Sequence, residues 1–169
     1  MKIGRILLTL LVIVLGLEIG AGIYEARVLV PLWASAPPGS LVAYNLQALR
    51  PNPGLHFWII TTPLVGLLAL VNLVAAFRSA PPRRLWWLMG SLLAVTVVVM
   101  TFVYFVPELQ TFERLRDREA VTMTWKVQRW VAWNWIRAVV YILAWLSLLR
   151  AFSLHSVRPN PGTAAVGKG

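Results

Sequence analysis

The sequence predicts an all-α integral membrane protein in which four transmembrane helices form one bundle. Of the 169 residues, 59% are hydrophobic and 13% are charged, whereas about a quarter of the residues in soluble domains are charged. Four apolar segments each have the roughly 20 residues that one bilayer crossing needs. The nine tryptophans agree with this prediction, because Trp is enriched at membrane interfaces. We expect one transmembrane domain over residues 1–153, with spans at about 6–33, 55–77, 85–106 and 125–152.

The composition also narrows the classes of function. The chain has no cysteine, which excludes disulfide redox chemistry, thiolate metal sites, iron–sulfur clusters and cysteine nucleophiles. The formal net charge is +10, but the Lys and Arg residues lie at the ends of the apolar segments and in loops. That placement is typical of topology signals and of contacts with lipid headgroups. We therefore expect membrane lipid, and no nucleic acid, as the partner of this charge.

The first span, 6–33, carries two carboxylates, Glu18 and Glu25. Its apolar character continues to Trp33, which indicates an uncleaved span and not a signal peptide. An ionisable side chain in the middle of a bilayer costs roughly a few kcal/mol or more unless it faces a protein interior, water or a partner. The two carboxylates are seven residues apart, or two helical turns, so they share one face of the helix. Gly22 lies between them on nearly the same face and leaves room for another group to approach.

The longest loop, residues 34–54, connects the first two spans. Its middle part predicts a short helix, in which Leu41 and Tyr44 either lie on the membrane or cap the bundle. A loop of this length in a compact bundle is either a lid over a site or a simple covering. The second span, 55–77, contains Pro63, which predicts a kink.

The third span, 85–106, is expected to stop at Pro107, because proline interrupts the hydrogen bonds of a helix. Thr101, Tyr104 and Glu108 follow one another at intervals of three and four residues. This spacing predicts that they share one face of the last two turns.

The fourth span, 125–152, begins with the densest mixture of aromatic and polar residues in the chain. Helical spacing places four of its side chains in a single stripe, namely Trp130, Asn134, Arg137 and Tyr141. The residues that follow, 154–169, are rich in Pro, Gly and small residues, and we expect them to form a disordered tail.

The basic residues predict the orientation in the membrane. In a four-span arrangement, one side of the bilayer receives Lys2, Arg5, Arg78, Arg83, Arg84, Arg150, Arg158 and Lys168. Cytoplasmic loops carry an excess of Lys and Arg. We therefore expect both termini, and with them the tail, on the cytoplasmic side of a bacterial inner membrane.

The polar residues of different spans are expected to meet at similar depth. At the helical rise, Glu25 lies ~12 Å below the outer end of its span, Arg137 ~18 Å and Glu18 ~22 Å. Arg137 can therefore pair with either carboxylate, which is the natural way to neutralise an intramembrane charge. We expect a polar pocket in the outer half of the bundle, covered by the loop at 34–54. Three interpretations stay open: residues that only hold the helices together, a ligand or reaction site, and a proton or ion path.

This cluster has the groups for acid–base chemistry without a cofactor. An apolar environment allows a carboxylate, here Glu25 or Glu18, to act as a general base near neutrality. Arg137 and Asn134 can hold a developing oxyanion. The expected substrate-binding residues are Trp130, Tyr104, His56, Tyr24 and Tyr141. The alternative is a metal ion held by Glu18, Glu25 and His56, although the chain has no Glu-x-x-His or His-x-x-His spacing.

Two short motifs carry a resemblance to a known family. They are the first-span sequence Gly20-Ala-Gly22 with its polar end running into Pro31-Leu-Trp33, and the fourth-span sequence Trp130-Val-Ala-Trp133-Asn134-Trp135-Ile-Arg137. The chain resembles the anthrone oxygenase-like family of small four-span membrane proteins, most of them bacterial and of unknown function. The fungal proteins that give the family its name are similar to cofactor-independent oxygenases that convert an anthrone to an anthraquinone. The resemblance implies deprotonation of the substrate at carbon, then reaction with oxygen, with Trp130, Asn134 and Arg137 in the site.

We therefore expect a membrane protein that binds, and as an enzyme oxidises, a hydrophobic aromatic or quinone-like molecule from the bilayer. The first alternative is an accessory or scaffold subunit of a larger membrane complex, or of a homo-oligomer, held together by the same polar residues. The second alternative is a proton-coupled carrier of small molecules.

Overall fold

The computed structural model describes residues 2–47, 53–114 and 120–154. Every regular element in these ranges is helical, which confirms the prediction of an all-α fold. Four helical stretches are long and apolar enough to cross a membrane: Ile3–Ala34, Gly54–Ala76, Arg83–Phe112 and Met123–Ser153. They identify an integral membrane protein with four spans. The tail expected at 154–169 lies almost wholly outside the described residues, and the orientation of the termini stays a prediction.

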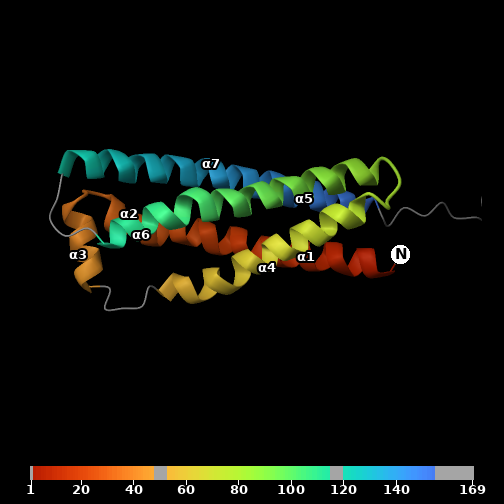
Figure 1. The fold of residues 1–169 in the computed structure, drawn as a ribbon, viewed down its shortest axis with the longest axis horizontal. Helices are drawn as coiled ribbons and strands as arrows, with labels where there is room; N and C mark the ends of the chain where they lie inside the picture. The colour runs from red at the N-terminus through yellow and green to blue at the C-terminus, as the bar shows by residue number, and fades with distance from the viewer. Residues whose placement is uncertain (1, 48–52, 115–119, 155–169) are drawn as a thin grey trace, which may run out of the picture.

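Four long helices form an elongated antiparallel bundle (Figure 1). They are α1 (Lys2–Tyr24), α4 (Pro53–Ala76), α5 (Arg83–Met100) and α7 (Ala120–Ser153). Each helix packs against two others, so that α1, α4, α5 and α7 follow one another around the bundle and α7 returns to α1. The N-terminus and the turn between α4 and α5 lie at one end, here called the N-terminal end. The short helices α2, α3 and α6 lie at the opposite end, here called the α3 end.

Close packing at the N-terminal end holds the bundle together. A Cβ atom added to Gly90 would lie 2.7 Å from Leu148 Cγ and 2.9 Å from the carbonyl oxygen of Ala144, so α5 and α7 meet at a position that only glycine fits. Asn72 is fully buried, and its amide donates to the carbonyl oxygens of Leu7 and Leu68 and accepts from the indole of Trp87. This polar residue joins helices and has no group left for a ligand.

The first span contains a wide turn before its end. After α1 the chain forms the π-helical turn η1 (Glu25–Leu29) and then α2 (Val30–Ala34), and the N–H of Val30 donates to the carbonyl oxygen of Glu25. Pro31 follows immediately. A proline ring collides with the carbonyl group four residues earlier in a regular α-helix, and a wider turn relieves such a collision. The helix therefore passes through Pro31 and ends at Ala34.

The third span repeats this arrangement and extends beyond its expected end. The π-helical turn η2 (Thr101–Phe105) follows α5, and the N–H of Val106 donates to the carbonyl oxygen of Thr101. Pro107 is the second residue of the next helix, α6 (Val106–Arg114), and does not stop the span. The expectation that the helix ends at Pro107 is corrected for the same physical reason: the wide turn accommodates the proline ring.

The α3 end is closed by an apolar cluster. The loop predicted at 34–54 contains α3 (Gly39–Gln47), in which Leu41 is buried. The cluster includes Val30, Trp33, Leu41, Phe105, Phe112, Met123, Val127 and Trp130. The short helix was expected either to lie on the membrane or to cap the bundle. In the structure it caps the bundle. Residues 48–52 of this loop lie outside the described ranges.

Candidate functional site

Glu18 lies at the centre of the bundle with both carboxylate oxygens occupied. Its side chain is 1% exposed. Oε1 accepts a hydrogen bond of 3.1 Å from the hydroxyl of Thr62 on α4, and Oε2 accepts one of 2.8 Å from the hydroxyl of Tyr141 on α7. The carboxylate is therefore tolerated because two hydroxyl donors from two other helices satisfy it.

Arg137 lies beside this network and is fixed by three neighbours. Its Nη1 donates to Thr101 Oγ1 at 3.2 Å and its Nη2 donates to Asn134 Oδ1 at 2.7 Å. The guanidinium carbon lies 4.1 Å from the centre of the Phe105 ring, a distance at which a cation–π interaction is favourable. Arg137 makes no direct ion pair with Glu18 or Glu25 in the described structure and attracts both at longer range. The expected pairing is thus a charge interaction at longer range than a salt bridge.

A cavity of about 190 Å³ brings Glu25 and Arg137 together. Its lining comes from η1, α4, the third span and α7, and comprises Glu25, Leu55, Trp58, Thr62, Thr101, Phe105, Val106, Leu109, Gln110, Trp130, Arg137 and Tyr141. Glu25 and Thr101 are the first residues of the two π-helical turns, and such turns are frequent at functional sites. The Trp58 side chain is a hydrogen-bond partner of Glu25. We call this space the large cavity.

A second space, of about 30 Å³, lies on the other side of Arg137 and Tyr141. It is lined by Glu18, Ile19, Gly22, Ile23, Trp58, Asn134, Arg137, Ala138, Tyr141 and Ile142. Trp58, Arg137 and Tyr141 line both spaces. Glu25 faces only the large cavity and Glu18 only the small one, although the two carboxylates share a face of the first span. About 30 Å³ is the share of one water molecule in the liquid.

Apart from Glu18 and Glu25, the structure places the predicted site residues in three groups. Four of them, Trp130, Asn134, Arg137 and Tyr141, form the expected stripe and line one or both cavities. Tyr104 packs against the rings of Phe105 and Trp133 and lines neither cavity. The side chains of His56 and Tyr24 are exposed, Tyr24 by 58%, and also line neither.

On the second span, sequence reasoning chose His56 and missed the residues that line the large cavity. These are Leu55, Trp58 and Thr62, and their spacing of three and four residues places them on one helical face. An indole and a hydroxyl on one stripe of this helix were the available signal. No three His, Asp or Glu side chains come close enough to hold a metal ion in the part of the chain that the structure describes.

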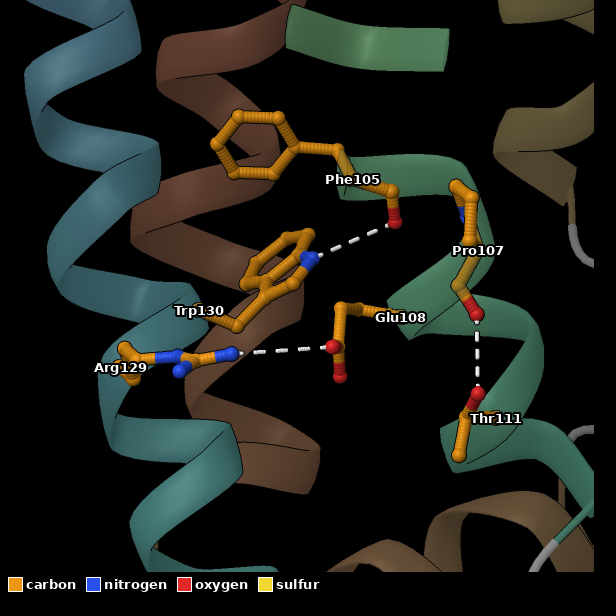
Figure 2. A network of polar contacts seen from close by, with 6 residues as sticks. All are labelled: Phe105, Pro107, Glu108, Thr111, Arg129 and Trp130. Atoms are coloured by element: carbon orange, nitrogen blue, oxygen red, sulfur yellow. Dashed lines mark hydrogen bonds and ion pairs between the residues drawn. The ribbon is translucent and has the colours of Figure 1, made fainter. Parts of the chain in front are cut away.

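A separate polar network fixes α6 against α7 (Figure 2). Arg129 Nη2 lies 3.8 Å from Glu108 Oε1, and the indole N–H of Trp130 donates to the carbonyl oxygen of Phe105 at 3.4 Å. The hydroxyl of Thr111 donates to the carbonyl oxygen of Pro107 at 3.0 Å. The network holds α6 in place, and α6 is the part of the cavity wall that follows η2 in the chain.

Comparison with known proteins identifies the family. A family model described as anthrone oxygenase matches residues 55–147, which is more than half of the chain. The match includes α4, the third span and most of α7, and thus Asn134, Arg137 and Tyr141, whereas Glu18 and Glu25 precede it. The comparisons with curated proteins and with solved structures give no match. On the four-span fold and the family match together, this chain belongs to the anthrone oxygenase family.

Proposed function

We propose that the protein binds a flat, lipid-soluble aromatic molecule of the anthrone or quinone type in the large cavity and oxidises it with dioxygen. The observation that carries this proposal is the composition of that cavity. One carboxylate, Glu25, and one guanidinium, Arg137, face a space walled by the rings of Trp58, Phe105 and Trp130. Aromatic walls suit a flat ligand, and an acid–base pair suits proton removal from carbon.

Glu25 is the candidate base in this mechanism. The CH₂ group of an anthrone loses a proton to the Glu25 carboxylate, and the electron pair moves onto the ring carbonyl oxygen. Arg137 is the group that stabilises this oxyanion, because Thr101 and Asn134 hold its guanidinium in place before the reaction. Glu18 is not the direct base, since it faces the small cavity and both its oxygens already accept hydrogen bonds.

The remaining steps balance with dioxygen as the oxidant. The carbanion adds to dioxygen and, after taking up a proton, gives a hydroperoxide at the same carbon. Loss of the second C–H proton breaks the O–O bond and forms the new carbonyl group, and hydroxide leaves as water with a returned proton. The sum is anthrone plus O₂ to anthraquinone plus H₂O. This chemistry requires no cofactor, in line with the donor set of the large cavity.

The size of the cavity sets a condition on binding. About 190 Å³ lies below the roughly 300–1,000 Å³ of pockets for drug-sized ligands. A three-ring molecule therefore requires the rim of the cavity to widen when it enters.

The test uses purified protein in lipid nanodiscs with anthrone as the probe. Formation of anthraquinone, followed by absorbance, and uptake of oxygen are expected in equal amounts. Glu25→Gln is expected to lower the rate by about 10²–10⁴-fold, the contribution of a general base. Thr61→Val is the control, because Thr61 is next to the cavity-lining Thr62 but lines neither cavity, and its hydroxyl donates to the carbonyl oxygen of Phe57 in its own helix. Turnover by Glu25→Gln at the rate of the unchanged protein would contradict the assigned base.

One observation favours a second candidate, a scaffold or accessory subunit. The two hydroxyl donors on Glu18 join three helices, as buried polar residues do in purely structural bundles. In that case Glu25→Gln and Arg137→Gln lower stability, and the double variant recovers part of the loss. Single variants that stay stable but bind and oxidise nothing support the enzyme instead. For a subunit of a membrane complex, the proposal is that this chain assembles with other chains. For a proton-coupled carrier, the proposal is that the chain transports a small-molecule ligand.

A further inference from the structure

The rim of the large cavity is exposed on one side of the bundle and is apolar apart from Gln110, which is also exposed. Leu55, near the start of α4, is 50% exposed, and Val106, at the start of α6, is also exposed. Both line the cavity. Ile59 and Ile60, one turn further along α4, are exposed as well. In a membrane this surface faces the acyl chains of the lipids.

Helices α4 and α6 are held apart on this side. The Arg129–Glu108 ion pair and the bond from Trp130 to Phe105 attach α6 to α7 (Figure 2). Helix α4 packs mainly against α1 and α5. At the α3 end, its first turns diverge from the other helices of the bundle (Figure 1). The cavity therefore extends between two helices that are each anchored elsewhere.

The route from the α3 end is closed in the described structure. The ring of Trp33 lies with its centre 5.3 Å from that of Trp130 and 6.1 Å from that of Phe112, and Phe105 lies 5.5 Å from Trp130. Leu41 of α3 packs onto this cluster. No described residue of α3 lines the large cavity, so the helix covers an aromatic plug and not the cavity itself.

From these contacts we infer that the large cavity is entered sideways from the bilayer, between α4 and α6, and takes neutral, lipid-soluble ligands. The inference rests on the proposed function for the kind of ligand, but the route follows from the rim and the plug. Dioxygen, which dissolves well in lipid, reaches the cavity by the same route. Charged, water-soluble molecules are excluded, because the plug of Trp33, Phe105, Phe112 and Trp130 separates the cavity from the α3 end.

The test requires no turnover and uses the natural absence of cysteine. A spin label on Leu109→Cys reports from the lining of the cavity. Its collisions with dioxygen and with a neutral water-soluble nickel chelate are measured by electron paramagnetic resonance in nanodiscs. Leu92→Cys on the exposed face of α5 and Arg78→Cys in the α4–α5 turn give the reference values for lipid and water.

The expected result is collision with dioxygen like that of the lipid reference, and little collision with the nickel chelate. Val106→Trp, which narrows the rim, should lower the dioxygen value, whereas Ile59→Trp, exposed on α4 but outside the lining, should not. A nickel value like that of the water reference, or exclusion of both reagents, overturns the inference. If Leu109→Cys fails to fold, Trp58→Cys, at a partly buried position, takes its place in the same lining. Lateral access without oxidation of anthrone would refute only the proposed function.

Discussion

Replacing Tyr141 with Phe tests how much the hydroxyl donor on Glu18 stabilises the bundle. The substitution keeps the ring and removes only the hydroxyl, which donates to Glu18 at 2.8 Å in a buried setting. Leaving a buried acceptor without its donor costs about 1–3 kcal/mol, whereas interhelical hydrogen bonds in membranes average about 0.6 kcal/mol. We therefore expect Tyr141→Phe to lower the free energy of unfolding by about 1–3 kcal/mol.

The assay is equilibrium unfolding in mixed micelles with increasing dodecyl sulfate, followed by tryptophan fluorescence. Thr62→Val removes the second donor, at 3.1 Å, and should cost a comparable amount. Thr61→Val is the matched control, because its hydroxyl bonds only the carbonyl oxygen of Phe57 in the preceding turn, an interaction that adds little to stability. Losses of about 0.6 kcal/mol or less for both Tyr141→Phe and Thr62→Val, equal to that of Thr61→Val, would refute the argument that the two hydroxyl donors stabilise Glu18 inside the bundle.

Three further predictions use the same unfolding measurement. Gly90→Ala should destabilise the bundle by about 1–3 kcal/mol, because the added Cβ meets α7 at 2.7 Å, whereas Gly20→Ala, with no atom within 4 Å, should not; equal effects would contradict the packing argument. Asn72→Leu should cost at least about 1–3 kcal/mol, since it leaves a buried indole N–H without an acceptor; an unchanged midpoint would show that water replaces the amide. Arg129→Gln should cost no more than about 1 kcal/mol, because its pair with Glu108 is partly exposed and the bond from Trp130 to Phe105 still attaches the third span to α7; a larger loss would show that the ion pair is the main attachment.

The fold was predictable because the bilayer limits what a chain can do. A run of about 20 apolar residues must form a helix there, as every backbone polar group needs a partner within the segment. The four spans follow from this rule alone. The rule does not say where a helix ends once it leaves the membrane. It therefore could not predict that α6 extends past Pro107 to Arg114.

The candidate site was predictable where the relevant residues share one helix. Asn134, Arg137 and Tyr141 are placed by their spacing on α7, and the structure brings all three to the cavities. The partners on α4 were harder to identify, because spacing shows only that Trp58 and Thr62 share a face, whereas the direction of that face depends on packing between the helices. For the same reason, the sequence could not assign Glu18 and Glu25 to different cavities.

The two π-helical turns explain why helical spacing failed in the third span. A π-turn adds one residue, so the positions after it rotate by about 100° relative to a regular helix. Regular spacing groups Thr101 with Tyr104 and Glu108, but with the added residue Leu109, eight residues after Thr101, comes two full turns later and joins Thr101 in the cavity lining. Tyr104 is turned toward Trp133 instead.

The same rotation occurs in the first span, where it places Glu25 and the plug residue Trp33 on one face of the helix. Trp33 is eight residues after Glu25, which in a regular helix is about 80° away from the face of Glu25. With one residue added by η1, Trp33 comes two full turns after Glu25 and so lies on the same face, where it is buried against Trp130. Glu25 therefore faces the cavity while Trp33 closes its end because of a single wide turn. Each of the two turns is followed by Val-Pro, so that Pro31, and Pro107 where a helix end was expected, each accompany a turn that keeps the span continuous.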